Sequence, residues 1–414
     1  MRILHLNTSD RLGGAARSAY RLFKSEESLG MCARLLTLNK TIDDPHIITY
    51  TGKYNKFRKF VNQRFNNEII KLLGSRVETP WNTNMMPYSL PVNSDDWDIL
   101  HLHWINGGFI KYGTLAGLKK PIVWTLHDSW PFTGGCHIPY ECKKYEIGCE
   151  KCPQLLGSHR IDLAKIVFKA KQKYYPANIT IVCPSNWLAN CARRSRIFGN
   201  NKIHVIPNGL DMDVYKPLNK KMARELLGIP ETKRVILFGA VSATSDRNKG
   251  YAYLLQAINV LKQQYCQGDI ELLVFGGNKP DGDAKIPYHI RYLGHLFDDI
   301  SLVVLYSAAD VMIVSSKSEN FPNSVLESMS CGTPCVAFDI GGIPDLIMHK
   351  ENGYLAKPYE AEDIARGIKF ILGDKERRAK LSEAARKYVV AKCDIRVVAK
   401  QHKHLYEEIL SNTK

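Results

Sequence analysis

Residues 311–327 read VMIVSSKSENFPNSVLE and contain the end of one structural element and the start of another. The apolar run 311–314 predicts a buried strand, and Pro322 suits the first position of a helix. Glu319 then lies in the connecting loop. Glu327 lies in the second helical turn, aimed back toward that loop, because helical side chains tilt toward the N-terminus. A strand, a polar loop and a helix in this order are the repeating unit of doubly wound α/β proteins.

The same alternation of buried strand and helix recurs along the whole chain. Apolar runs bounded by turn residues occur at 2–7, 33–38, 98–103, 122–126, 179–183, 203–206, 235–239, 270–275, 311–314 and 334–338. Continuous apolar strands that alternate with helices are typical of parallel sheets covered on both faces. We therefore predict an α/β protein with two Rossmann-like, doubly wound domains.

Turn residues divide the chain near its middle, at Pro207-Asn208-Gly209-Leu210-Asp211. We predict an N-terminal domain at 1–207, a second domain at 208–395, and a C-terminal helix at 396–414 that packs back on the first domain. Domains of roughly 200 residues can each bury a full core. Two such sheets facing one another would leave a ligand cleft between the carboxyl ends of their strands.

The composition narrows the class of protein. The chain has 414 residues, of which 45% are hydrophobic and 24% charged, as in an ordinary globular protein. It has no run of 18 apolar residues, and its first residues lack the pattern of a signal peptide, so we expect a cytoplasmic protein. The net charge of +16 suits nucleic acid, anionic lipid or a phosphorylated substrate. No nucleic-acid-binding motif accompanies it, so we expect no nucleic-acid partner.

Two glycine-containing loops follow predicted strands and are candidates for binding an anion. Gly13 and Gly14 open the first helix, where a close approach of backbone N–H groups and the helix N-terminus favours a phosphate. Arg247 and Lys249 stand before the helix that follows the 235–239 strand, and two cations there can neutralise a diphosphate. The competing interpretations are plain turn geometry for the glycines and solvated surface charge for the lysine.

Carboxylates and a histidine complete the candidate site. Glu319 and Glu327 can grip hydroxyl groups, while the backbone N–H groups of Asn320 and its neighbours face a phosphate or a sugar oxygen. His127 ends a buried strand at the presumed cleft and can hydrogen-bond a substrate hydroxyl. Helix capping by the carboxylates and a structural role for the histidine are the alternatives.

Taken together, these motifs resemble those of glycosyltransferase family four, a family of retaining enzymes with the GT-B fold of two Rossmann-like domains facing a cleft. The resemblance covers nearly the whole chain. The motifs that carry it are Gly13-Gly14, His127, Pro207-Asn208-Gly209-Leu210-Asp211, Lys249-Gly250, Glu319 with Glu327, Ser328-Met329-Ser330-Cys331-Gly332-Thr333-Pro334 and Gly341-Gly342-Ile343-Pro344.

The resemblance implies specific roles for these residues. Catalytic roles fall to His127, near the reacting carbon of the donor sugar, to Glu319, which would hold that sugar, and to Lys249, which would stabilise the leaving diphosphate. Donor-binding roles fall to these residues: Gly13, Gly14, Arg247, Lys249, Asn320, Phe321 and Glu327, the last on the ribose. Many members carry Gly-Arg after the first strand of the second domain, whereas this chain has Gly239-Ala240. We expect Arg247 to replace the missing arginine.

The implied reaction is sugar transfer with retained anomeric configuration and without a required catalytic metal. The donor would be a UDP- or GDP-sugar, and the acceptor a glycan or lipid-linked precursor in bacterial surface-polysaccharide synthesis, such as capsule or lipopolysaccharide. A catalytically idle protein that only binds nucleotide sugars is the alternative. The retained His127, Lys249 and Glu319 argue against it.

Four cysteines lie within seventeen residues, in the loop 136–152. Their spacing, Cys136, Cys142, Cys149 and Cys152, contains a Cys-x2-Cys knuckle that is typical of a tetrahedral zinc site. We predict a structural zinc ion, which would supply folding energy to a loop poor in apolar residues. Free buried thiols and disulfides are the alternatives, and His137 is a substitute ligand.

Residues 54–73 combine an apolar stripe at helical spacing with many basic residues. This composition suits a helix that lies on an anionic membrane surface. A helix packed against the core, with a solvated basic face, is the alternative. We expect peripheral contact with the inner face of the cytoplasmic membrane.

Overall fold

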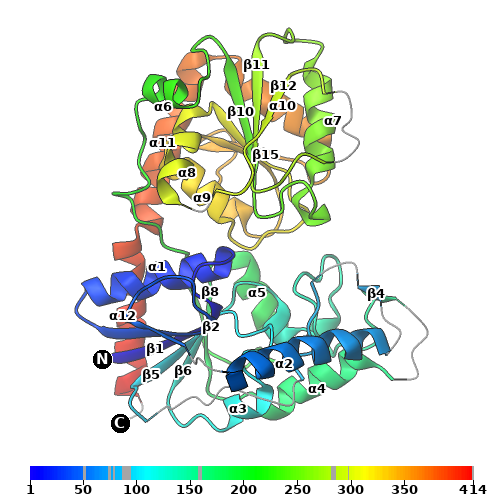
Figure 1. Cartoon of the computed structure of the whole chain (residues 1–414), viewed down its shortest axis with the longest axis vertical. Helices are drawn as coiled ribbons and strands as arrows, with labels where there is room; N and C mark the ends of the chain where they lie inside the picture. Colours follow the sequence, from blue (N-terminus) through cyan, green and yellow to red (C-terminus); the bar gives the residue numbers. More distant parts are fainter. Residues whose placement is uncertain are drawn as a thin grey trace. The chain divides into compact units, whose positions relative to one another are not determined.

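The computed structural model of the chain describes residues 1–49, 53–72, 76–77, 80–85, 95–156, 161–280, 286–296 and 298–412. These residues form two compact units, shown in Figure 1. The first unit consists of Met1–Pro207 together with Val398–Lys414, and the second of Asn208–Val397. The chain therefore leaves the first unit at Pro207 and returns to it at Val398.

A parallel seven-stranded sheet is the centre of the first unit. Its strand order is β3-β2-β1-β5-β6-β8-β9, so the order reverses direction between β1 and β5. The strands are β1 (Arg2–Ser9), β2 (Cys32–Asn39), β3 (Ile47–Thr49), β5 (Ile99–Leu102), β6 (Ile122–Thr125), β8 (Thr180–Cys183) and β9 (Ile203–Val205). Ligands of such sheets bind beyond the carboxyl ends of the strands, at the reversal.

Helices cover both faces of this sheet. The helices of the unit are α1 (Gly14–Ser28), α2 (Lys53–Leu72), α3 (Tyr112–Ala116), α4 (Leu163–Tyr174), α5 (Asn186–Arg194) and α12 (Ile395–Ser411). On one face Ile3 packs with Leu22 of α1 and Leu405 of α12. On the other face the alternating residues, such as Leu4, pack against α3, α4 and α5. A separate antiparallel pair joins β4 (Arg76–Val77) and β7 (Leu155–Leu156).

The second unit repeats this architecture with a parallel six-stranded sheet of order β12-β11-β10-β13-β14-β15. Its strands are β10 (Arg234–Gly239), β11 (Ile270–Phe275), β12 (His289–Tyr292), β13 (Val311–Val314), β14 (Cys335–Phe338) and β15 (Gly353–Ala356). Its helices are α6 (Lys220–Leu226), α7 (Tyr251–Leu261), α8 (Asp299–Ala308), α9 (Asn323–Ser330), α10 (Ala361–Leu372) and α11 (Lys375–Cys393). Along β10, Val235 and Leu237 face α8, α9 and α11, whereas Ile236 and Phe238 face α7 and α10.

The predicted α/β class with two doubly wound sheets is confirmed, and all ten predicted strands are present. The bounds of two of them, Ile270–Phe275 and Val311–Val314, match the prediction at both ends. The prediction of Pro322 as the first helical residue is wrong by one position. Pro322 is the N-cap of α9, with an extended ψ of 118°, and the helix begins at Asn323. Within the described residues, no helix is long and apolar enough to cross a membrane.

Candidate active site

Two loops of the second unit meet at the carboxyl ends of the neighbouring strands β10 and β13. The backbone N–H of Lys317 donates to Asn248 O at 2.7 Å, and Asn248 Nδ2 donates to Ser318 O at 3.0 Å. Gly250 lies against Ser315 with a φ of +69°, and a Cβ there would overlap the Ser315 carbonyl. The loops are therefore held together by backbone contacts that require glycine at position 250.

This junction places Lys249 beside Glu319. Lys249 ends a short 3₁₀ helix, η3 (Arg247–Lys249), and its Nζ lies 2.7 Å from Glu319 Oε1. Burial works to lower the pKa of Lys249, but the Glu319 carboxylate outweighs it and the pKa is raised above its usual value. The lysine is therefore a fixed positive charge at neutral pH. In this structure its partner is the neighbouring carboxylate.

The Glu319 loop is also fixed from its other side. Gly342 N donates to Glu319 O at 3.0 Å, and a Cβ at Gly341 would overlap the same carbonyl. Gly341 has a φ of +55°, in the left-handed region that favours glycine. Of the two predicted donor-binding residues that follow, Asn320 is half-buried and Phe321 is packed into the core.

Glu327 lies on α9 and is buried, with only 3% of its surface exposed. Tyr306 of α8 donates its hydroxyl to Glu327 Oε2 at 3.1 Å. Burial, reinforced by this carboxylate, raises the pKa of Tyr306 well above its usual range, so the hydroxyl stays protonated and keeps donating. Glu327 is thus more deeply buried than Glu319, whose side chain is 14% exposed.

Arg247, the predicted substitute for a missing arginine, lies at the start of the short helix η3, two residues before Lys249. Its side chain is exposed, and within the described residues it makes no hydrogen bond or ion pair. Gly239, after which the resemblance leads us to expect an arginine, lies against the Phe275 ring so closely that a Cβ would overlap it. The backbone at the end of β10 is therefore packed directly on β11.

The first unit contains the remaining predicted residues. Gly13 has a φ of +93° and is the N-cap of α1, directly after β1, and a Cβ there would meet no atom within 4 Å. Helix α1 starts at Gly14 and has no acidic residue in its first turn, so its positive end is not offset by a carboxylate of that turn. The loop has the local geometry expected for an anion, at the reversal of strand order.

His127 follows β6 and is half-buried. Its Nε2 lies 3.1 Å from Nδ1 of His103, which comes just after β5. Burial lowers the pKa of His127 to about 4, against the opposing effect of Asp128. The imidazole is therefore uncharged at neutral pH and acts as a hydrogen-bonding group, not as a cation.

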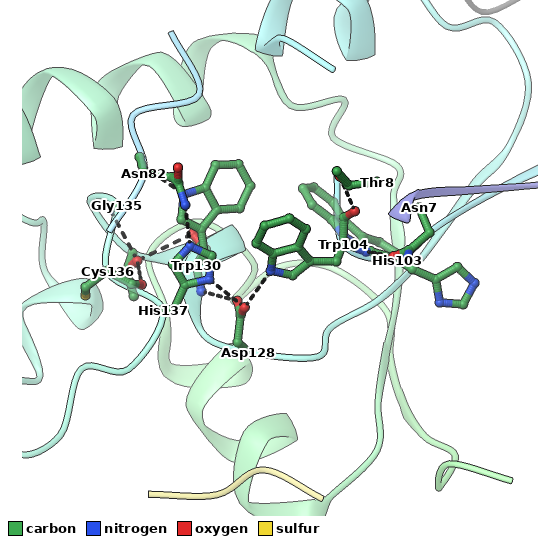
Figure 2. Close-up of polar contacts among 12 residues, drawn as sticks. Asn7, Thr8, Asn82, His103, Trp104, Asp128, Trp130, Gly135, Cys136 and His137 are labelled. Carbon is green, nitrogen blue, oxygen red and sulfur yellow. Dashed lines mark hydrogen bonds and ion pairs between the residues drawn. The ribbon is translucent and has the colours of Figure 1, made fainter. Parts of the chain in front are cut away.

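Asp128, next to His127, is the centre of a second network that sequence reasoning missed. Figure 2 shows its carboxylate between His137 and Trp104. His137 Nδ1 lies 2.6 Å from Asp128 Oδ2, and Trp104 Nε1 donates to the same oxygen at 3.1 Å. Burial works to raise the pKa of Asp128, but His137 and the donors around it outweigh this and lower the pKa. Asp128 is therefore ionised and fixed.

The same network continues to the asparagines of α2 and its surroundings. Asn82 Nδ2 lies 2.9 Å from His137 Nε2, and Asn66 Nδ2 donates to Asn82 Oδ1 at 3.3 Å. Both ring nitrogens of His137 are therefore engaged in hydrogen bonds, which argues against its use as a substitute for a cysteine ligand. A cavity of about 280 Å³ is lined here by Asn62, Asn66, Asn82, Asn84 and Gly108, among others.

The four cysteines of the loop 136–152 come together around one small cavity of about 10 Å³. A hydrogen bond from Cys136 lowers the pKa of the Cys152 thiol to about 6, and burial raises the pKa of Cys149 to about 11. All four thiols are free. Within the described range 95–156, however, no three of their sulfur atoms lie within 4.8 Å of one another. Thiolates bound to one zinc ion at about 2.3 Å would stand closer than this.

The basic stretch predicted as a helix is α2. Its aromatic side chains face solvent: Phe57, Phe60 and Phe65 are 56%, 60% and 41% exposed. The face that packs on the unit is partly polar and includes the buried Asn62. The alternative in which the aromatic stripe packs against the core is therefore wrong for these three phenylalanines. The other end of the predicted stretch, residue 73, lies outside the described residues.

Two family models match the chain, one for each unit. The family described as "Glycosyltransferase Family 4" matches residues 12–214, and the family described as "Glycosyl transferases group 1" matches residues 219–388. Among curated proteins, the chain is 28% identical over 251 residues to the colanic acid biosynthesis glycosyl transferase WcaC of Escherichia coli K12. That alignment covers 58% of each chain. A D-inositol 3-phosphate glycosyltransferase of Corynebacterium aurimucosum is 26% identical, with 70% of this chain and 67% of the relative covered.

Solved structures share the fold over the full length. Sucrose-phosphate synthase from Thermosynechococcus elongatus superposes with a TM-score of 0.66 at 19% identity, covering 100% of both chains. Anabaena HepE in complex with UDP-glucose gives 0.67 at 17% identity, also covering 100% of both. WaaG, described as a glycosyltransferase of lipopolysaccharide biosynthesis, gives 0.60 at 15% identity, with 98% of this chain and 99% of WaaG covered. These likenesses establish the GT-B arrangement of two Rossmann-like sheets.

Proposed function

The chain belongs to glycosyltransferase family 4, and from that premise we propose that it is a retaining enzyme using a nucleotide-diphosphate sugar. The observation that carries the proposal is the pairing of Lys249 with Glu319 at the carboxyl ends of β10 and β13. A cation and a carboxylate at this edge of an α/β sheet suit a ligand with a diphosphate at one end and hydroxyl groups at the other.

Lys249 stabilises the departing diphosphate in this proposal. When the donor binds, its phosphate oxygens share the Lys249 ammonium with Glu319, which then accepts hydrogen bonds from the donor sugar. Positive charge that is already in place when the bond to the anomeric carbon breaks lowers the barrier without reorganisation. No step requires a catalytic metal.

Glu327 holds the ribose hydroxyls, and UDP is the first donor nucleotide to examine. Anabaena HepE, a structural neighbour of this chain, is described in complexes with UDP and with UDP-glucose. A GDP-sugar is the second possibility. Asn320 and Phe321, in the loop before α9, would contribute backbone contacts to the donor sugar.

The acceptor is a hydroxyl-rich glycan or a lipid-linked glycan precursor of bacterial surface-polysaccharide synthesis. The names of WcaC and WaaG associate related proteins with colanic acid and lipopolysaccharide. In the first unit, the asparagine-lined cavity of about 280 Å³ offers amide donors and acceptors of the kind that bind sugar hydroxyls. The acceptor attacks from the side of the leaving group, whose phosphate takes the proton.

A lipid-linked acceptor agrees with peripheral binding of α2 to the inner face of the cytoplasmic membrane. Three exposed phenylalanines stand beside exposed Arg64 and Lys71 on this helix, a combination suited to the interface of anionic lipids. Vesicles containing anionic lipid should retain the protein at low salt and release it at high salt. Replacing Phe57 and Phe60 by serine should reduce retention. Equal retention by neutral vesicles would contradict the proposal.

We also propose a structural zinc ion at Cys136, Cys142, Cys149 and Cys152. The thiols already surround one cavity, and zinc would draw their sulfur atoms closer together. Elemental analysis of purified protein should find about one zinc per chain, lost in Cys149→Ser. The matched control is Cys183→Ser, a buried cysteine on β8 away from the loop. Full zinc content in the Cys149→Ser protein would exclude this site.

The donor and the stereochemistry can be tested on the intact protein. Ligands that bind only the folded state raise its melting temperature, so a panel of nucleotide sugars identifies the donor. The anomeric configuration of the product, read by NMR, then tests retention. Stabilisation by a nucleotide sugar without transfer to any glycan or lipid-linked acceptor would favour an idle binding protein. A product of inverted configuration would overturn the retaining mechanism.

A further inference from the structure

Between the sheet of the first unit and the helices α1 and α12, five buried ionisable or hydroxyl side chains are linked to one another by hydrogen bonds. They are His5 on β1, Glu26 on α1, His101 and His103 at β5, and Tyr406 on α12, each 0–3% exposed. Strand alternation explains their position. His5 pairs in register with His101, and His103 lies two residues further on, so all three imidazoles face α1 and α12.

Three hydrogen bonds connect Glu26 to His127 in a continuous line. Glu26 Oε2 lies 2.7 Å from His5 Nε2, and His5 Nδ1 lies 3.0 Å from His103 Nε2. His103 Nδ1 then lies 3.1 Å from His127 Nε2. We call this line, Glu26–His5–His103–His127, the histidine relay. It joins a carboxylate inside the unit to the residue assigned to the sugar.

A side branch fixes the far side of the Glu26 carboxylate. Tyr406 donates its hydroxyl to Glu26 Oε1 at 2.8 Å, and its oxygen accepts from His101 Nδ1 at 2.7 Å. His101 Nε2 in turn lies 2.7 Å from the Thr125 hydroxyl. Ligand atoms of His5, His101 and His103 lie within 4.8 Å of one another, as in a metal site. Every ring nitrogen of these three residues already has a hydrogen-bond partner, which favours a hydrogen-bond relay over a metal site.

The relay has only one arrangement of protons when Glu26 is ionised and the imidazoles are neutral. The carboxylate can only accept, so His5 carries its proton on Nε2 and leaves Nδ1 as an acceptor. His103 must then carry its proton on Nε2, which leaves its Nδ1 as an acceptor. By the same reasoning His127 donates to that atom and carries its own proton on Nε2. We propose that Glu26, His5 and His103 act as positioning residues that hold His127 with its proton on Nε2, so that Nδ1 serves as a hydrogen-bond acceptor for a substrate hydroxyl.

Electrostatics in the unit support neutral imidazoles at His103 and His127. Burial, with the neighbouring histidines His5, His127 and His402, lowers the pKa of His103 well below its usual value. The ionisable groups facing the relay from packed elements are Glu26, Tyr406, His101 and His402, together with Asp128 next to His127. An added proton that preserved all three hydrogen bonds would have to appear on Nδ1 of His127. Adding a proton to the relay therefore changes the protonation of that one atom.

This inference rests on the proposed function only for the identity of the hydroxyl, which belongs to a sugar. The consequence is chemical selectivity at His127 Nδ1. This atom recognises a hydroxyl that donates a hydrogen bond, and it does not recognise a group that can only accept one. The arrangement itself is a property of the first unit and can be measured without any substrate.

The test is ¹⁵N NMR of the full-length chain labelled at histidine, which reports which ring nitrogen carries the proton. We expect His127, assigned by comparison with His127→Gln, to carry its proton on Nε2 at neutral pH. In Glu26→Gln, Tyr406 keeps its bond to the amide oxygen and the amide N–H₂ faces His5, so every bond of the relay reverses. The proton of His127 should then move to Nδ1.

Controls separate the relay from general damage to the core. His101→Phe disturbs an equally buried imidazole on the same strand but outside the relay, and should leave the His127 proton on Nε2. His103→Phe breaks the relay and should lower kcat by about tenfold, with a smaller change in the donor KM, as expected for one misplaced hydrogen bond. A wild-type His127 protonated on Nδ1, or one unchanged by Glu26→Gln, would overturn the inference even if the enzyme is active. Failure of all transfer activity with the expected NMR result would instead count against the proposed function.

Discussion

The ionisable groups of the two units differ in their access to a ligand. In the second unit, Lys249 and Glu319 lie on loops after the strands, and their side chains are 22% and 14% exposed. In the first unit, His5 and His103 lie on or directly after strands, within the layer between sheet and helices. A ligand can reach the first pair and exchange partners with it. The second group can act only through the orientation that it imposes on a neighbour such as His127.

Removing the Lys249 cation should have the largest effect. If Lys249 stabilises the leaving diphosphate, Lys249→Ala should lower turnover by roughly a hundredfold, as for the loss of one preorganised electrostatic stabiliser. It should weaken ground-state donor binding much less. Steady-state kinetics and donor titration on the same preparation separate the two quantities. Normal turnover in a folded variant would place the phosphate site elsewhere.

Neutralising the deeper carboxylate should have the next largest effect. Glu327→Gln keeps an oxygen for the Tyr306 hydroxyl but weakens hydrogen bonds to the ribose, and should cost about 1–3 kcal/mol of donor affinity. Tyr306→Phe is the matched control, because it keeps the carboxylate and removes only its partner. Calorimetry with the nucleoside diphosphate measures both. Donor affinity that is unchanged in Glu327→Gln would remove the ribose role.

Acid should destabilise the first unit selectively. Burial lowers the pKa of His127 to about 4 and that of His402 to about 3, whereas both take a proton near 6.5 when unfolded. Below pH 6.5 the unfolded chain binds more protons, so stability should fall as the pH falls toward 4. The loss is at most about 1.4 kcal/mol per pH unit for each histidine.

Tryptophan fluorescence measures this effect in one unit alone. All six tryptophans of the chain lie between positions 81 and 187, within the first unit. Denaturant titrations at pH 7 and pH 5, followed by this fluorescence, should show the fall. His402→Gln should make it shallower. A free energy of unfolding that is constant between these pH values would contradict the assignment of buried, neutral histidines.

The smallest effect is expected at Arg247. Its guanidinium is exposed, so solvent screens its charge, and it makes no ion pair within the described residues. Arg247→Ala should change turnover by less than about fivefold, because an exposed charge contributes roughly 0–1 kcal/mol. Turnover rates of Arg247→Ala and Lys249→Ala, measured in the same assay, show how much each cation contributes to stabilising the phosphate. A loss as large as that of Lys249→Ala would mean that Arg247 turns inward when the donor binds.

The strands whose bounds could be predicted best are central strands whose residues are buried on both faces. Strands such as β11 and β13 are continuous apolar runs, and their bounds follow from hydrophobicity alone. In the two parallel sheets, the strands that were not predicted, β3, β12 and β15, all lie at sheet edges. The separate pair of β4 and β7 was not predicted either. In β12 no residue is fully buried, and Glu271 of β11 pairs with its His289 and Arg291. An edge strand with charged side chains has no apolar pattern to detect.

The candidate site divides in the same way. Lys249, Glu319 and Glu327 could be proposed because they lie in short motifs after recognisable strands. The histidine relay depends on the register of β1 with β5 and on α12, which follows the whole second unit in sequence. The one local signal was a histidine within an otherwise apolar strand, at positions 5, 101 and 103. A buried histidine shows that a hydrogen-bond partner is needed. Only the fold shows that Glu26 and Tyr406 are the partners.

Helix α12 also has a consequence for biosynthesis. Tyr406 and Leu405 complete the core of the first unit, yet residues 398–412 leave the ribosome only after all of the second unit has been made. During translation the first 207 residues therefore lack the α12 part of the apolar cluster that includes Ile3, Leu22 and Val123, and this part of the core stays incomplete. Such exposed apolar surface is what chaperones bind. The second unit, continuous in sequence, is free to fold first, and the nascent first unit is the part that we expect to need protection from aggregation.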